Sequence, residues 1–169
     1  MCFKIGVVTD EISQDLVEAV EAAQSWGLEY IELHSVWGQN ICDVDSSTLS
    51  KVISIVRSSG LTVTGIDSLT LRCNLDDDQE YDDHISHLHR SIEVARLFNT
   101  NMVRLFSFWK LDQISEEAWK KIFDKMELPI RIAEREGIIL GFENVSSGNI
   151  GTSQDLEKLF THFDSSNLQ

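Results

Sequence analysis

Short hydrophobic runs alternate with longer amphipathic segments along the whole chain, and this alternation limits the possible fold more than any other feature. The hydrophobic runs are rich in β-branched residues, as expected of strands buried on both faces. The longer segments repeat apolar residues at helical spacing, as expected of helices that cover such a sheet. The predicted strands span 4–9, 29–34, 61–66, 101–107 and 138–143, and the helices that follow them span about 15–26, 46–60, 81–98, 115–136 and 153–163.

Glycine follows three of the predicted helices just before the next strand, in the segments WGLEYIEL, SGLTVTGI and EGIILGFE. A left-handed residue commonly ends a helix before the chain turns into a buried strand, and glycine takes that conformation without steric cost. Each strand and helix together occupy roughly 30–35 residues, the size of a β/α unit. The sequence therefore predicts a parallel α/β fold of about five β/α units, in a single domain over residues 1–169.

Local signals predict where individual helices begin, bend and end. Ser46 or Ser47 is expected to cap the second helix, and Ser153 the last. Pro129 is expected to kink or divide the fourth helix, because proline removes one backbone hydrogen bond. A sixth strand is due at residues 167–169.

The charge balance excludes some classes of partner. The chain has 14 Lys and Arg against 28 Asp and Glu, a formal charge of −14. Such a surface repels phosphate backbones and anionic lipids, so we expect neither nucleic acid nor membrane as a partner. No leader-like or membrane-spanning run occurs, which favours a cytoplasmic location. The cysteines, Cys2, Cys42 and Cys73, have no paired spacing and are expected to be free thiols.

Polar and aromatic residues follow nearly every predicted strand at once. In parallel α/β proteins, functional groups gather at the carboxyl ends of the strands. Carboxylates, an imidazole and an indole at these positions suit a small polar substrate held around a metal. These residues are Asp10 and Glu11, His34, Asp67 and Ser68, 107–109, and Glu143 with Asn144.

Motifs of competing functions are absent from the sequence or poorly placed. No GxGxxG follows the first strand, and neither GxxxxGK[ST] nor GxSxG occurs, so nucleotide-binding and serine-hydrolase functions lack their loops. His84, His87 and His89 have the spacing of metal ligands. They lie near the start of the third helix, away from the strand ends, and a solvated or capping role is favoured.

Several strand-end segments resemble the sugar phosphate isomerase/epimerase family, which is a xylose isomerase-like TIM barrel related to AP endonuclease family 2. The segments are VTDEIS, YIELHSVWG, DSLTLRCNLDDD, RLFSFW and GFENVSSGNIGT. The resemblance extends from 4 to 168 and implies an incomplete (β/α)₈ TIM barrel that contains strands one to five. Because a closed barrel needs eight strands, we expect the chain to be a truncated barrel.

The resemblance also implies a metal and a catalytic carboxylate. Family members hold one divalent ion (Mn, Mg, Co or Zn) with residues after strands five to eight, and only the first of these four ligands has a counterpart here, at Glu143. The same Glu exchanges the α-proton of the substrate through an enediolate while the metal polarises the oxygens. Glu143 could instead be a strand-end carboxylate that pairs with Arg104. The chain also departs from the family at 143–147, where the family's ENEHS reads ENVSS, and this weakens any inference about the substrate.

Four further residues are predicted to bind the substrate: His34, Trp109, Glu11 and Asn144. Three of them have a plainer alternative that the sequence leaves open. His34 could be an ordinary loop histidine, Trp109 a packing residue at the barrel rim, and Glu11 a cap of the first loop or helix.

The sequence thus favours a fragment of a metal-dependent sugar or sugar-phosphate isomerase/epimerase. We expect the isolated chain to be inactive and not to bind the metal tightly, since it lacks three of four expected ligands. Two alternatives remain: a metal phosphodiesterase of the endonuclease IV type, and a non-catalytic half-barrel that binds a partner. Open sheet edges also predict self-association.

Overall fold

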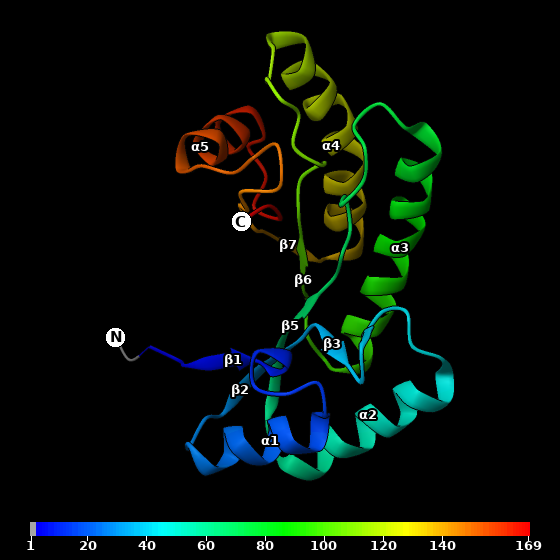
Figure 1. Cartoon of the computed structure of the whole chain (residues 1–169), viewed down its shortest axis with the longest axis vertical. Coiled ribbons are helices and arrows are strands. Elements are labelled where there is room, and N and C mark those ends of the chain that lie inside the picture. The colour runs from blue at the N-terminus through cyan, green and yellow to red at the C-terminus, as the bar shows by residue number, and fades with distance from the viewer. Residues whose placement is uncertain (1–2) are drawn as a thin grey trace. The chain divides into compact units, whose positions relative to one another are not determined.

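The computed structural model describes residues 3–169, so the predicted thiol of Cys2 lies outside the described residues. Among them the chain forms two compact units, one of residues 3–68 and 91–102 and the other of residues 69–90 and 103–169. The boundaries fall inside α3 (Asp78–Leu97) and after the first residue of β6 (Met102–Leu105). Figure 1 follows the elements along the chain. The predicted α/β alternation is confirmed, because each predicted strand occurs and a helix follows each one.

The first unit is built on three parallel strands in the order β1-β2-β5. They are β1 (Gly6–Val8), β2 (Tyr30–Leu33) and β5 (Thr62–Asp67). Ile31 is paired with Val7 on one side and Val63 on the other, and its side chain is fully buried. Burial of such aliphatic side chains away from water, the hydrophobic effect, is the main force that holds a unit of this kind together.

Two helices of the first unit pack against each other, and they run side by side in Figure 1. They are α1 (Leu16–Ser25) and α2 (Ser46–Ser59). The prediction that Ser46 or Ser47 caps α2 is wrong: the N-cap is Asp45, whose side chain accepts a hydrogen bond from the Thr48 N–H. A carboxylate adds a favourable charge at the positive end of the helix dipole, which a serine does not. Gly60 ends α2 in the left-handed conformation, with φ of 73°, as predicted.

A small hairpin follows β2, which the sequence analysis did not predict. Its strands are β3 (Ser35–Val36) and β4 (Gln39–Asn40). The two turn residues, Trp37 and Gly38, both have positive φ, as a two-residue hairpin turn requires. Tryptophan is an unusual residue for that position, so the turn gives little signal in the sequence.

The second unit contains the end of β6 and β7 (Ile139–Phe142), which are neighbours in the sheet. The last residues of the chain continue this pattern, since Leu168 forms a parallel bridge with Leu140. The N–H of Leu140 donates to the carbonyl of Asn167 at 2.7 Å, and the N–H of Gln169 donates back to Leu140 at 2.9 Å. The end of the chain therefore forms an isolated bridge to β7 at the place where the sequence predicts a further strand.

The long helix α4 (Glu116–Glu136) passes through Pro129 without interruption, so it is not divided there as the sequence suggested. Pro129 is buried with the apolar face of the helix, whose packing compensates for the missing hydrogen bond. Ser115 caps the start, and Gly137, with φ of 67°, ends the helix. The buried apolar face comprises Trp119, Ile122, Met126, Ile130, Ile132 and Ala133.

Two other helix starts differ from the prediction. The third helix, α3, begins at Asp78 rather than near Tyr81, and the carboxylate of Asp77 accepts a hydrogen bond from the Glu80 N–H at 2.9 Å. The last helix, α5 (Ser153–His162), is capped by Thr152 and not by Ser153. Thr152 and Asp155 form a capping box, in which each side chain bonds the backbone of the other residue.

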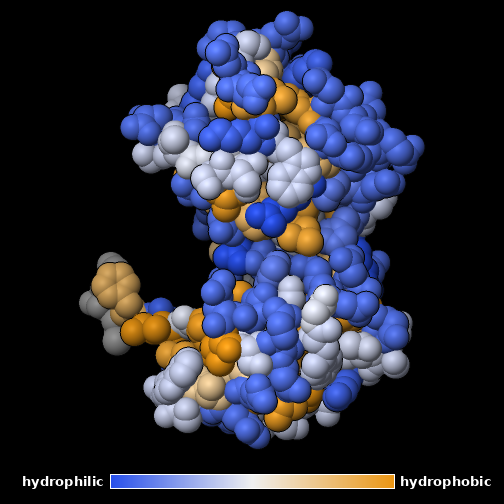
Figure 2. Space-filling view, viewed as in Figure 1, coloured by the Kyte–Doolittle hydropathy of each residue, from blue (hydrophilic) through white to orange (hydrophobic). Residues whose placement is uncertain are grey.

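Most of the surface visible in Figure 2 is hydrophilic, with hydrophobic colour along the N-terminal segment. In that segment Phe3 is 87% exposed and Ile5 is 69% exposed. Among the described residues, no helix combines the length and the apolar character needed to cross a membrane.

Candidate functional site

An aspartate and a histidine meet at the carboxyl ends of β1 and β2 in the first unit. The short 3₁₀ helix η1 (Thr9–Glu11) follows β1 and carries Asp10. His34 is the first residue after β2, and its Nδ1 lies 2.6 Å from Asp10 Oδ2. Glu11, which was predicted to bind substrate, is exposed, so Asp10 is the carboxylate that contacts the imidazole.

The geometry of this pair suits proton transfer or hydrogen bonding to a ligand. The Nδ1–H of His34 donates to Asp10, which leaves Nε2 as the group that can exchange a proton or a hydrogen bond. Both side chains are mostly buried, with exposed fractions of 26% for His34 and 13% for Asp10. The second oxygen of Asp10, Oδ1, is buried and makes no hydrogen bond within residues 3–169. A buried acceptor without a donor is costly, so a ligand hydroxyl there would be stabilising.

In the second unit, the carboxylate predicted as the metal ligand is paired with an arginine. Glu143 directly follows β7, and its N–H donates to the carbonyl of Leu105 at 3.0 Å. Its Oε2 lies 3.2 Å from Arg104 Nε on β6. Both atoms are buried, but they are not aligned for a hydrogen bond, so the contact is an ion pair. The structure thus has the Glu143–Arg104 pairing that the sequence left as an alternative.

The residues described do not by themselves fit the metal that the resemblance implies. Within residues 3–169, no three His, Cys, Asp or Glu side chains are grouped closely enough to hold a metal ion. A divalent ion bound by protein normally takes three or four such ligands. His84, His87 and His89 do not form such a site: His84 and His87 meet edge to face, with ring centroids 6.4 Å apart, and His87 Nδ1 lies 3.3 Å from the Thr70 hydroxyl.

The indole predicted to bind substrate contacts an arginine that the sequence analysis did not single out. Trp109 is 40% exposed, and the guanidinium carbon of Arg72 lies 5.5 Å from the centroid of its ring. The same carbon lies 4.2 Å from the centroid of the Phe106 ring. Arg72 belongs to the long connection after β5, where the segment DSLTLRCNLDDD carries an isolated cation beside an acidic run. That isolated charge was the one available signal.

Two backbone hydrogen bonds hold the connection after β5 against the segment after β6. The N–H of Phe106 donates to the carbonyl of Thr70 at 3.1 Å, and the N–H of Trp109 donates to the carbonyl of Cys73 at 2.9 Å. Between them Leu71 takes the left-handed conformation, with φ of 65°, although its side chain is fully buried. Such a conformation costs about 1–3 kcal/mol and persists only where the surroundings impose it.

The connection after β7 is also tied to the segment after β6. Gly148 bridges with Trp109, and a Cβ on Gly148 would approach the Ser107 hydroxyl to 2.4 Å, so only glycine fits. The Ser107 hydroxyl accepts from the N–H of Ile150 at 3.0 Å. Asn144, predicted to bind substrate, donates its side-chain amide to the carbonyl of Gly151 at 3.3 Å. In this structure it stabilises the connection in which it lies.

Cys73 is unsuited to act as a nucleophile near neutral pH. Burial is the main cause that raises the pKa of its thiol to about 11, and the charge of Glu80 adds to the effect. A protonated thiol is a poor nucleophile and a poor metal ligand. Cys42, the other described cysteine, is also buried and is not part of a disulfide, as predicted.

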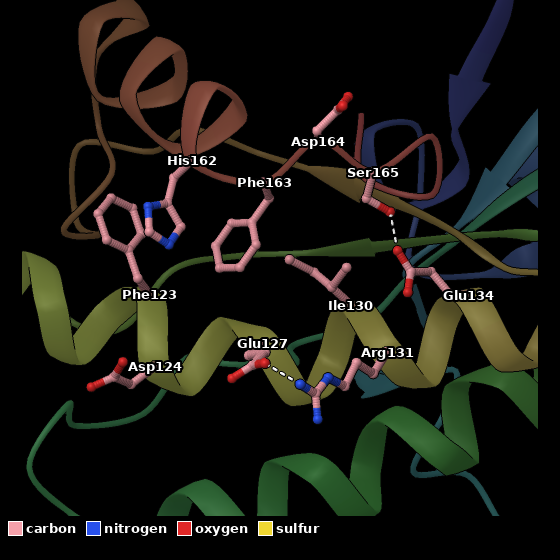
Figure 3. Close-up of a pocket in the computed structure, with 10 residues that line it drawn as sticks. All are labelled: Phe123, Asp124, Glu127, Ile130, Arg131, Glu134, His162, Phe163, Asp164 and Ser165. Atoms are coloured by element: carbon pink, nitrogen blue, oxygen red, sulfur yellow. Dashed lines mark hydrogen bonds and ion pairs between the residues drawn. The ribbon is translucent and has the colours of Figure 1, made fainter.

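A pocket of about 400 Å³ lies elsewhere in the second unit, between α4 and the end of α5 (Figure 3). His162 stacks on Phe123 there, with ring centroids 3.8 Å apart, and the Ser165 hydroxyl donates to Glu134 at 2.6 Å. The residues that line this pocket belong to α4 and to the end and continuation of α5, and none of them directly follows a strand. We assign the candidate site to the strand ends, because parallel α/β proteins place their chemistry there.

Comparison with known proteins shows that the sequence of this chain matches a family of barrels. The sequence profile described as xylose isomerase-like TIM barrel matches residues 20–169. None of the curated proteins is similar enough in sequence to be a match.

Solved structures are similar over almost the whole chain. The probable 3-DHS dehydratase AsbF, involved in petrobactin synthesis, from Bacillus anthracis has 20% identity and a TM-score of 0.79, over 99% of this chain and 61% of that one. The IOLI protein with a bound zinc atom has 16% identity and a TM-score of 0.76, over 98% and 61%. The 3-keto-D-glucoside 4-epimerase YcjR from E. coli has 15% identity and a TM-score of 0.74, over 99% and 67%.

At these identities the similarity establishes the fold alone. The chain spans 26% of the length of a fusion protein that contains such a barrel and 63% of a magnesium-bound barrel from Mycobacterium smegmatis. The matched barrels are therefore longer than this chain.

Proposed function

Because the chain belongs to the xylose isomerase-like TIM-barrel family, we propose that it forms the N-terminal part of a sugar or sugar-phosphate isomerase or epimerase. One observation carries the proposal: a carboxylate, Glu143, stands directly after β7 in the second unit. At that position it is suited to remove and return a proton on the carbon next to a substrate carbonyl.

Two of the similar structures support this reaction class by their names. One is an epimerase and one a probable dehydratase. The similarity to the dehydratase covers 99% of the present chain. Epimerisation and dehydration can both begin with removal of a proton next to a carbonyl. A small polyhydroxylated carbonyl compound would suit the polar strand end at which Glu143 lies.

Glu143 has Arg104 as its neighbouring cation in this chain. In the first unit, His34 with its Asp10 partner is a further group able to bind a substrate hydroxyl through Nε2.

The divalent metal of the family would require ligands that these residues do not provide. We therefore assign no catalytic step to a metal on this chain, and we propose that the chain alone does not turn over substrate. A cytoplasmic location also stays a prediction.

The alternatives are less well supported. A phosphodiesterase of the endonuclease IV type needs a cluster of metal ligands, and residues 3–169 contain no group of three candidates. The formal charge of −14 also opposes contact with a phosphate backbone. A non-catalytic half-barrel that binds a partner is favoured by no specific contact in either unit.

The proposal is tested by Glu143→Gln in a chain completed with the later strands of a related barrel. Gln keeps the size of the side chain but cannot accept the proton. Activity on a ketose or ketose phosphate is expected to fall by about 10²–10⁴-fold, the loss typical of a positioned acid or base. Exchange of the substrate α-hydrogen with deuterated solvent should disappear in parallel.

Glu127→Gln is the matched control, because Glu127 is an exposed carboxylate on α4 that pairs with Arg131. It should leave turnover and exchange unchanged. If Glu143→Gln retains near-normal turnover and exchange, Glu143 has a structural role and the proposed function is wrong.

A further inference from the structure

Arg72 differs from three other arginines of the second unit in having no carboxylate partner. Arg104, Arg131 and Arg135 each form an ion pair with a glutamate. No ion pair or side-chain hydrogen bond involves Arg72 in residues 3–169, and its Nε is buried without a hydrogen-bond partner. In a chain with 28 acidic residues, Arg72 thus has two aromatic rings as its neighbours and forms no ion pair within the described residues.

We propose that Arg72 binds an oxyanion of the substrate, either a phosphate ester or a carboxylate. This inference deepens the proposed function, on which it rests for the identity of the site. It assigns to the connection after β5 a role in selecting substrates that carry a negative charge.

The position of the guanidinium is built into the backbone. Thr70 and Cys73, on either side of Arg72, accept hydrogen bonds from Phe106 and Trp109 at 3.1 and 2.9 Å. These bonds place Arg72 beside the two rings that its guanidinium contacts. Leu71, buried and in the left-handed conformation, sets the direction of the chain just before it.

The contact with the rings leaves the guanidinium able to bind an anion. Its carbon lies 4.2 Å from the Phe106 centroid and 5.5 Å from the Trp109 centroid, a cation–π arrangement. Such an arrangement uses the face of the guanidinium and leaves the N–H groups at its edge to donate. A phosphate or a carboxylate accepts two parallel hydrogen bonds from that edge, which an ammonium group does not offer.

The rings also reduce the loss of side-chain freedom on binding. An arginine in contact with two aromatic side chains has fewer accessible conformations, so less conformational entropy is lost when the anion arrives. Trp109 is 40% exposed, and its ring can contact the carbon chain of the same ligand.

The test uses the full 169-residue chain labelled with 5-fluorotryptophan, and it measures binding rather than turnover. The chain has four tryptophans, and a Trp109→Phe variant identifies the ¹⁹F signal of Trp109. Three probes are titrated: ribose 5-phosphate, ribonate and ribose. They share a carbon chain and carry a phosphate, a carboxylate and no charge, so they distinguish the two kinds of anion.

The Trp109 signal should shift in a saturable way with one of the two anions, about tenfold or more tightly than with ribose. Arg72→Met keeps an apolar stem against the rings and should abolish this preference. Arg72→Lys keeps the charge but loses the planar fork and should weaken it. Arg131→Met removes an exposed arginine of α4 and should have no effect.

Three results would overturn the inference: no saturable shift of Trp109 with either anion, equal binding of ribose, or unchanged anion binding in Arg72→Met. The dispersion of the other three ¹⁹F signals shows whether each variant is folded, and Arg72→Lys decides the question if Arg72→Met is not. Because no turnover is measured, the result is independent of the Glu143→Gln experiment. Anion binding without proton exchange would retain Arg72 and refute the proposed reaction.

Discussion

Arg104 Nε lies 3.2 Å from Glu143 Oε2, so the carboxylate expected to bind a metal is accompanied by a protein cation. The two residues sit on β6 and directly after β7, neighbouring strands of the second unit. Their side chains are 26% and 36% exposed, so water screens the pair and its contribution to stability is small. Its effect is on the site, because the positive charge of Arg104 beside Glu143 opposes the approach of a second cation.

The first prediction follows from this pair. Calorimetric titration of the chain with Mn²⁺ or Zn²⁺ should show no stoichiometric site of sub-micromolar affinity, since one carboxylate paired with arginine is a weak ligand set. In the Glu143→Gln variant, the small heats measured on addition of the metal should be the same as in the wild type. A tight stoichiometric site would contradict this expectation, and loss of that site in His84→Asn with His87→Asn would place it on α3.

The second prediction concerns the tautomer of His34. At a pH where the imidazole is neutral, its proton should be on Nδ1, because Asp10 Oδ2 accepts there at 2.6 Å. Long-range ¹H–¹⁵N spectra of the imidazole distinguish the two tautomers. Asp10→Asn should produce a mixture of the two tautomers at His34. The signals of His162 should stay unchanged and serve as the internal control. A wild-type His34 with its proton on Nε2 would refute the orientation proposed for substrate binding.

The third prediction separates the observed cap of α5 from the one expected from the sequence. Thr152→Ala removes the half of the capping box in which the Thr152 hydroxyl accepts from the Asp155 N–H, and it should lower the free energy of unfolding by about 1 kcal/mol. Ser153→Ala lies in the first turn and should change it by less than about 0.5 kcal/mol. Urea denaturation of the two variants compares them directly. The reverse order would mean that Ser153 is the cap after all.

The fourth prediction concerns alkaline pH. Burial raises the pKa of the Cys73 thiol to about 11 from an ordinary value of 9.0. The unfolded chain therefore loses this proton first as the pH rises. The contribution of the protonated Cys73 thiol to the free energy of unfolding is complete below about pH 9. It is lost between pH 9 and 11, by up to about 1.4 kcal/mol per pH unit.

Urea unfolding at pH 8, 9 and 10 measures this loss. Cys73→Ala should reduce the slope of unfolding free energy against pH in that interval. Tyr81, whose pKa burial raises to about 12, adds a similar loss above pH 10 in both proteins. An equal slope in wild type and Cys73→Ala below pH 10 would show that the thiol does not contribute.

The fifth prediction concerns self-association. β1 is the first strand in the order of the described sheet, and it pairs with β2. Ile5, the residue just before β1, is 69% exposed. An apolar segment at the edge of a sheet is a template for pairing with another chain. Light scattering at several concentrations should show a mass that rises with concentration, and Ile5→Lys should suppress the rise. Val17→Lys, at an exposed position on α1, should not. A concentration-independent monomer mass in the wild type would show that this edge does not pair.

The sequence by itself determined the succession of strands and helices along the chain. This is because the spacing of hydrophobic residues and the glycines after helices are local properties of the chain. It also determined that Glu143, His34 and Trp109 stand where strands end, since a strand-end position follows from the strand itself. Helix caps were less certain: Asp45 and Thr152 compete with neighbouring serines of nearly equal local preference, and only the backbone geometry selects one.

The tertiary structure alone decided which side chains meet. Asp10 rather than Glu11 contacts His34, because η1 turns the chain after β1 by an amount that no sequence pattern specifies. Arg72 reaches Phe106 and Trp109 through backbone bonds between segments more than thirty residues apart. Pairing over such distances depends on loop closure and packing of the whole unit, whereas periodicity reports only on neighbours along the chain.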